Sequence, residues 1–157
     1  MNTARRLWAD LTSEEYRFAV LLGIAVIPVV LVENLVLGMP ATNEPLMATG
    51  LGVACLVAGW VYERREGEPM RAGVVTALVG GSVLVVWSVF QVLTGWWGNP
   101  TLVDALGETG MAVATGLAVI MVVFFMLAIL VVVGIVAGII GGKLRTVGRE
   151  TGVAAHQ

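Results

Sequence analysis

Residues 117–142 read LAVIMVVFFMLAILVVVGIVAGIIGG, twenty-six positions without a charged or hydrogen-bonding side chain. At about 1.5 Å per residue, an α-helix of this length spans roughly 39 Å. That exceeds the hydrocarbon core of a bilayer, which is about 30 Å thick, and exceeds what a core helix of a soluble protein needs. A helix satisfies every backbone N–H and C=O within one segment, and the alternating pattern of a membrane barrel is absent. The stretch therefore predicts a transmembrane helix that ends at Lys143 and Arg145.

The composition of the whole chain is typical of an integral membrane protein. The 157 residues are 58% hydrophobic and 13% charged, with a mean hydropathy of +0.92, whereas soluble domains carry about 25% charged residues. The formal net charge of −2 and the lack of a long basic stripe argue against nucleic acid as a partner. The single cysteine, Cys55, lies in an apolar segment and has no second cysteine with which to form a disulfide inside the chain.

Three further apolar segments complete a predicted set of four spans, at residues 18–39, 46–62, 72–95 and 112–142. Two connections are short: GMPATNE at residues 38–44, rich in helix breakers, and the charged ERREGEP at residues 63–69. The third, 96–107, is longer, and Asn99-Pro100 favours a short surface helix within it. We therefore expect an all-α fold, an integral membrane four-helix bundle of two antiparallel transmembrane hairpins in a single domain that contacts the lipid bilayer.

The two ends of the chain are less apolar than the spans. Residues 1–12 place apolar side chains on one helical face and charged ones on the other, which is typical of a helix lying in the headgroup region, with a frayed terminus as an equal alternative. Thr12 and Glu15 have the spacing of a capping box before the first span. Residues 143–157 are polar and are expected to form a cytoplasmic tail.

All nine basic residues fall on the same side of the predicted membrane. They precede the first span, join the second to the third, or follow the fourth: Arg5, Arg6, Arg17, Arg64, Arg65, Arg71, Lys143, Arg145 and Arg149. Because basic loops stay in the cytoplasm, both termini are predicted to be cytoplasmic, in a multi-pass protein of the plasma membrane. Aromatic residues are expected at both interfaces: Tyr16, Trp60 and Tyr62 at the inner one, Trp96 and Trp97 at the outer one.

Small residues recur at helical spacing on two of the predicted spans. They are Gly73, Ala77 and Gly81 on the third span and Gly134, Gly138 and Gly142 on the fourth. Such stripes let helix backbones approach closely, which matters in lipid because hydrocarbon tails give helices no hydrophobic reason to associate. Two interpretations stay open. The stripes can serve packing within the bundle, or form a seam by which the chain binds itself or a larger membrane protein.

Glu33 is the one carboxylate inside a predicted span. Counting along the helix places it roughly 7–8 Å outward of the middle of that span, where a charge costs less than the about 2.5–3.5 kcal/mol it costs at the centre. Polar residues expected at similar or shallower depth are Asn34, Thr49, Ser88 and Gln91. Facing inward, these side chains would form a polar layer around Glu33. The layer is interpreted either as a proton- or cation-binding vestibule or as a carboxylate that only snorkels or stabilises the bundle.

Catalytic chemistry has little support in the sequence. The one histidine, His156, is the penultimate residue, and no cluster of His, Cys, Asp or Glu has the spacing of a metal site. Ser82 and Ser88 have no histidine or lysine nearby in the predicted membrane region to activate them. We therefore expect no catalytic residues, no metal ion and no cofactor.

The segment Gly50 to Gly81 combines a span rich in glycine and alanine, the charged turn ERREGEP and the sequence MRAGVVTALVGG. This segment, about a third of the chain, resembles small haloarchaeal four-helix membrane proteins of unknown function. The resemblance implies four helices in an archaeal plasma membrane and carries no activity. The leading hypothesis is a non-enzymatic structural or accessory subunit that works through helix–helix packing. The alternative is an oligomeric channel or a proton- or cation-coupled transporter that uses Glu33.

Overall fold

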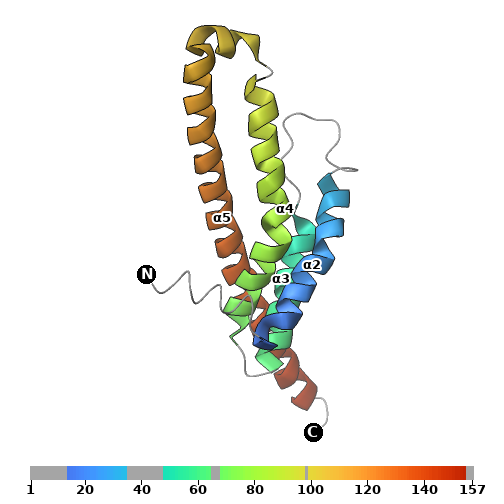
Figure 1. Cartoon of the computed structure of the whole chain (residues 1–157). Coiled ribbons are helices and arrows are strands. Elements are labelled where there is room, and N and C mark those ends of the chain that lie inside the picture. The colour runs from blue at the N-terminus through green and yellow to red at the C-terminus, as the bar shows by residue number, and fades with distance from the viewer. Residues whose placement is uncertain (1–13, 35–47, 65–67, 98, 155–157) are drawn as a thin grey trace. The chain divides into compact units, whose positions relative to one another are not determined.

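The structure, a computed structural model, describes residues 14–34, 48–64, 68–97 and 99–154. All regular structure in these residues is helical, which confirms the predicted all-α class with four helices of 16 residues or more (Figure 1). In chain order the elements are η1 (Glu14–Tyr16), α2 (Arg17–Val32), α3 (Thr49–Arg64), α4 (Pro69–Trp97) and α5 (Pro100–Ala154). The predicted interfacial helix at 1–12 and the predicted turn at 38–44 lie outside the described residues.

Among the residues that the structure describes, two helices are long and apolar enough to cross a membrane. They occupy Pro69–Gly95 in α4 and Thr101–Val147 in α5. The other two, α2 and α3, are apolar but comprise 16 residues each, or about 24 Å. The predicted first span, 18–39, extends beyond Asn34 into residues outside the described part. The 16 residues of α2 therefore do not test the predicted length of this span.

Both long helices begin with a proline, Pro69 or Pro100. Proline suits the first helical position because the N–H that it lacks would have no partner there. Ahead of α5, the Asn99 side chain caps the helix, its Oδ1 accepting a hydrogen bond from the Thr101 N–H at 3.2 Å. The short helix expected after Asn99-Pro100 is present and ends at Gly107, whose φ of 65° and ψ of 171° interrupt α5. A positive φ is accessible to glycine because it has no Cβ.

The end of α5 lies well beyond the end of its apolar sequence. The apolar stretch stops at Gly142, yet the helix continues to Ala154. The segment expected as a polar tail is therefore helical over most of its length. The end of the apolar sequence does not set the end of the helix, because residues of high helix propensity such as Leu144 and Arg145 extend it further.

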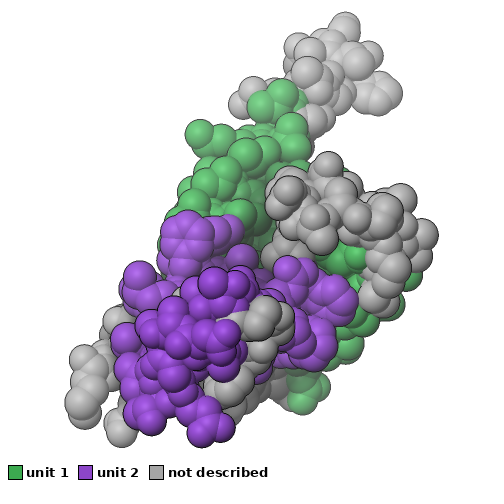
Figure 2. Space-filling view, turned by 90° about the horizontal axis from the view of Figure 1, so that it is seen from above, with its two compact units in different colours: residues 1–81, 130–157 green, residues 82–129 purple. Residues whose placement is uncertain are grey.

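The chain divides into two compact units (Figure 2). Unit 1 comprises residues 1–81 and 130–157, so it contains α2, α3, the first part of α4 and the last part of α5. Small side chains and the two tyrosines dominate its core cluster: Tyr16, Ala19, Ala58, Tyr62, Ala72 and Val75. The size of these side chains lets the helix backbones of unit 1 come close together.

Unit 2 comprises residues 82–129. Its buried residues among those the structure describes are Leu84, Ser88, Met111 and Thr115. Its large apolar side chains are mostly exposed: Val86, Phe90, Leu117, Ile120, Met121, Phe124 and Phe125. Exposed apolar side chains of this size and number are unusual for a protein that faces water.

Candidate functional site

Glu33 caps the beginning of α3. It follows the last residue of α2, and its Oε1 accepts a hydrogen bond from the backbone N–H of Gly50 at 3.0 Å. Gly50 is the second residue of α3, so this N–H has no carbonyl partner inside the helix. A carboxylate at this position satisfies the donor and interacts favourably with the positive end of the helix dipole. Glu33 therefore joins the end of α2 to the beginning of α3 by a hydrogen bond.

The neighbours of Glu33 in unit 1 are partly those that the sequence predicts. Asn34 is half-buried, and its Nδ2 donates a hydrogen bond to the Val30 carbonyl at 2.8 Å. Thr49, the first residue of α3, is exposed beside Gly50. The second carboxylate oxygen of Glu33, Oε2, is buried and has no hydrogen-bond partner in the described part of the chain. Glu33, Asn34 and the start of α3 thus lie together, with the carboxylate bonded to backbone.

Ser88 and Gln91 belong to unit 2. The Ser88 hydroxyl is buried and donates a hydrogen bond to the Leu84 carbonyl of its own helix at 2.8 Å. Gln91 is exposed. A serine that bonds back to the carbonyl four residues earlier has used its donor locally. The five-residue polar layer therefore stays a prediction.

Tyr62 caps the beginning of α2 at the other end of the α2–α3 hairpin. The first turn of α2 has no side-chain cap from Tyr16, the residue before it. Instead the Tyr62 hydroxyl, from α3, accepts a hydrogen bond from the Ala19 N–H at 3.4 Å and donates one to the Glu15 carbonyl at 2.8 Å. Each helix of the hairpin is thus capped by a side chain of the other.

The residue pattern alone did not predict this hydrogen-bonding role of the tyrosines. Both are expected at the inner membrane interface, and in the structure Tyr16 and Tyr62 are 3% and 1% exposed and stack with ring centroids 5.4 Å apart. The buried hydroxyl of Thr76 donates to the Ala19 carbonyl at 3.1 Å and ties α4 to the same turn. One feature of the sequence could have indicated the contact. The only two tyrosines of the chain lie just before the first predicted span and at the end of the second, which are adjacent in an antiparallel hairpin.

Tyr62→Phe is expected to lower the free energy of unfolding by about 0.5–1.5 kcal/mol, because it removes the hydroxyl and keeps the stacked ring. Thermal unfolding in detergent measures the loss. Hydrogen exchange should also become faster at the backbone amides of the first turn of α2. The matched control is Thr94→Val, since the Thr94 hydroxyl is exposed and bonds only within its own helix, to the Phe90 and Gln91 carbonyls. Equal unfolding of the two variants would contradict the capping role of Tyr62.

The predicted small-residue stripes meet inside unit 1, where α4 crosses α5. A Cβ atom built on Gly73 would lie 2.9 Å from Gly138 Cα, and one built on Gly134 would lie 2.7 Å from Val74 Cα. Real Cβ atoms do not approach backbone this closely, so these positions require glycine. Ala77 is fully buried, and a Cβ on Gly81 would lie 2.7 Å from Leu130 Cδ1.

A second close contact joins α3 to α5 and uses glycines that the stripes do not include. A Cβ on Gly59 would lie 2.8 Å from Gly138 Cα, and one on Gly141 would lie 3.0 Å from the Trp60 nitrogen. Gly138 therefore touches the backbones of both α3 and α4. Gly142 is less tightly enclosed, with its built Cβ 3.2 Å from Pro69 Cγ. Because the glycine face of α5 is covered within the chain, a self-association seam would need another face.

Residue types suited to metal binding do not cluster in the part of the chain that the structure describes. It contains no group of three or more His, Cys, Asp or Glu side chains that could hold a metal ion. Cys55 is a free and buried thiol. The candidate site is thus a set of helix caps and backbone contacts, whose chemistry is hydrogen bonding and packing.

Residues 16–144 match the family described as "Family of unknown function (DUF5518)". The chain belongs to the DUF5518 family. The matched DUF5518 region contains Glu33, Tyr62 and every glycine of the α3, α4 and α5 contacts, and it ends just before Arg145. No curated protein and no solved structure shows significant similarity to the chain. The description of the DUF5518 family names no activity.

Proposed function

We propose that the chain is a polytopic protein of the plasma membrane that acts as a structural or accessory subunit through helix–helix packing, without catalysis of its own. In this proposal the four helices cross the bilayer as two antiparallel hairpins, with both termini in the cytoplasm. An archaeal membrane is the setting that the resemblance of residues 50–81 suggests.

The observation that carries the proposal is the exposed apolar surface of α5. Only 11% of the most apolar 18-residue window in Thr101–Val147 is buried. A core helix of a soluble protein passes the same test of length and composition, but it is mostly buried. Exposed side chains such as Phe124 (75%) and Met121 (70%) would be costly in water and are suited to lipid or to an apolar helix of a partner.

Contacts inside unit 1 support the proposed orientation. The Tyr62 hydroxyl bonds to Glu15, which brings the end of α3 to the beginning of α2. The built Cβ of Gly142 lies 3.2 Å from Pro69 Cγ and 3.3 Å from Glu63 Oε2, which brings α5 to the same end. Basic residues of these segments therefore gather at one end of unit 1: Arg17, Arg71 and Lys143. Such sorting is what the positive-inside rule expects of a cytoplasmic face.

The close packing supports a structural role. Glycines give α5 backbone contact with α3 and α4 in unit 1, while large apolar side chains of the same helix, Val132, Val136, Ile140 and Leu144, are exposed. A surface of this composition can pack against a further membrane helix by van der Waals contact.

The subunit role is tested by native electrophoresis of native membranes solubilised in mild detergent. We expect the chain in a complex larger than the monomer, and a monomer throughout would contradict a subunit role.

A second candidate function is an oligomeric channel or a proton- or cation-coupled transporter that uses Glu33. The observation that favours it is Glu33 Oε2, which is buried and has no hydrogen-bond partner among the described residues. The cap on Gly50 favours the structural interpretation instead, because it gives the carboxylate a bonding role that transport does not need.

Glu33→Gln separates the two candidates. The glutamine carbonyl can still accept the hydrogen bond from Gly50, so only the interaction between the charge and the helix dipole is lost, about 0.3–1 kcal/mol. We expect unchanged assembly and unchanged ion flux in proteoliposomes. Glu33→Leu removes the acceptor as well and is expected to cost about 1–3 kcal/mol of stability, because the N–H of Gly50 loses its partner. Loss of flux in Glu33→Gln with assembly intact would instead support transport.

A further inference from the structure

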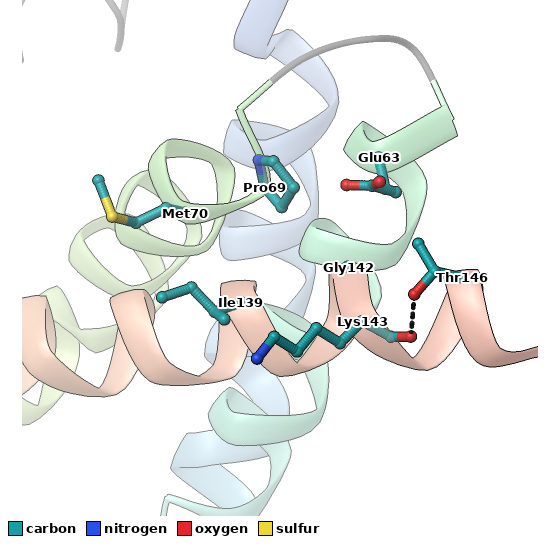
Figure 3. Close-up of a pocket in the computed structure, with 7 residues that line it drawn as sticks. All are labelled: Glu63, Pro69, Met70, Ile139, Gly142, Lys143 and Thr146. Carbon is teal, nitrogen blue, oxygen red and sulfur yellow. Dashed lines mark hydrogen bonds between the residues drawn. The ribbon is translucent and has the colours of Figure 1, made fainter.

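A pocket of about 230 Å³ lies in unit 1, where the end of α3 and the beginning of α4 meet α5. Its lining includes the charged residues Glu63 and Lys143 and the apolar residues Pro69, Met70 and Ile139 (Figure 3). The Glu63 carboxylate turns toward Pro69, while the Lys143 side chain extends along α5 toward Ile139. No ion pair joins these two charges in the part of the chain that the structure describes. Two opposite charges thus stand apart in one small pocket.

The α5 wall of this pocket changes from apolar to polar along the helix axis. Ile139 comes first, Gly142 and Lys143 follow one turn later, and Thr146 follows after another turn. These positions span roughly 10 Å. The change occurs where the apolar sequence of α5 ends, which in the proposed membrane orientation is the boundary between hydrocarbon and inner headgroups. The wall therefore has the same order of polarity as a lipid molecule, from acyl chain to headgroup.

We propose that this pocket binds the headgroup of an inner-leaflet phospholipid that carries a primary ammonium group. The lipid phosphate pairs with the Lys143 ammonium, the lipid ammonium donates hydrogen bonds to the Glu63 carboxylate, and the glycerol end lies against Ile139 and Met70. An anionic headgroup such as that of phosphatidylglycerol would offer Glu63 neutral hydroxyl donors but no positive charge, so it should bind less tightly than phosphatidylethanolamine. A quaternary ammonium would face Glu63 without an N–H. The inference rests on the proposed membrane location and adds a ligand class to it.

The test is native mass spectrometry of the full chain in mild detergent, titrated with phosphatidylethanolamine, phosphatidylcholine or phosphatidylglycerol of identical acyl chains. We expect phosphatidylethanolamine to bind more tightly than phosphatidylcholine by a factor of roughly five, as for a partly exposed ion pair. Glu63→Gln should remove this preference. The matched control Glu68→Gln should keep it, because Glu68 is an exposed acid at the same end that pairs with Arg71 outside the pocket. Equal binding of the two lipids by the wild-type chain would overturn the proposal.

Two further variants keep the test independent of Glu63. Lys143→Gln should weaken both lipids alike, because both carry the phosphate. Gly142→Ala leaves every charge in place but narrows the pocket, since the new methyl would lie 3.2–3.3 Å from Pro69 Cγ and Glu63 Oε2. It should lower phosphatidylethanolamine binding while helical circular dichroism stays unchanged. If Lys143→Gln and Gly142→Ala both bound phosphatidylethanolamine with wild-type affinity, the result would contradict binding of the lipid in this pocket.

Two controls identify the source of the headgroup and separate this inference from the proposed function. Free phosphoethanolamine should not displace the lipid, because it lacks the part that contacts Ile139 and Met70; displacement would overturn the lipid assignment. Alkaline carbonate extraction tests the membrane location itself. Release of the chain from membranes would contradict the proposed function, whereas a chain that stays in the membrane but shows no lipid preference contradicts only the pocket assignment.

Discussion

Gly138→Leu is expected to lower the free energy of unfolding by more than about 3 kcal/mol, at or beyond the upper end of the range for overpacked cores. Gly138 lies between two helices. A Cβ on it would meet the Pro69 carbonyl group and lie 3.2 Å from Met70 Cα, while Gly59 of α3 approaches Gly138 from another direction. All of these neighbours are backbone atoms, which cannot turn aside as a flexible side chain does. A leucine would therefore separate α5 from both α3 and α4.

Thermal unfolding followed by circular dichroism in detergent measures this effect, with Gly116→Leu as the matched control. Gly116 lies in the same helix, and a Cβ built on it has no heavy atom within 4 Å. Leucine there should leave the melting temperature unchanged or raise it, because leucine favours the helix over glycine by up to about 1 kcal/mol. If the Gly138→Leu and Gly116→Leu proteins had the same melting temperature, the glycine contacts would not be what holds the helices together.

The positions of the helices were largely predictable from the sequence. The apolar run at 112–142 lies inside α5, and the predicted span 72–95 lies inside α4. Asn99-Pro100 predicted the short helix before Gly107 because a cap and a proline act locally. The end of α5 at Ala154 was not predictable from hydropathy, since the helix continues into a sequence that is no longer apolar.

The partners of the candidate site residues were not predictable in the same way. Spacing showed that Gly134 and Gly138 share a face, but it did not show that the face meets both Gly73 and Gly59. Counting along the helix estimated the depth of Glu33, whereas its partner is a backbone N–H seventeen residues further along the chain. Tyr62 reaches Glu15 across forty-seven residues. These contacts depend on how two helices are set against each other, which composition and periodicity do not specify.

Labelling from outside intact cells is expected to separate two positions of the chain completely. The proposed orientation places the start of α4 in the cytoplasm and the short helix before Gly107 outside, because basic residues flank the first and only acidic ones lie near the second. Glu68 and Asp104 mark these places and are both exposed. Cys55, the only native cysteine, is buried and can be replaced by serine to leave one reactive thiol in each variant.

The decisive measurement is the reaction of Glu68→Cys and Asp104→Cys, each in the Cys55→Ser background, with a membrane-impermeant maleimide. We expect Asp104→Cys to be labelled in intact cells and Glu68→Cys to be labelled only after the cells are permeabilised. Both should react fully once the membrane is dissolved in detergent. Labelling of Glu68→Cys from outside, or equal labelling of both variants in intact cells, would contradict a chain whose basic segments all face the cytoplasm.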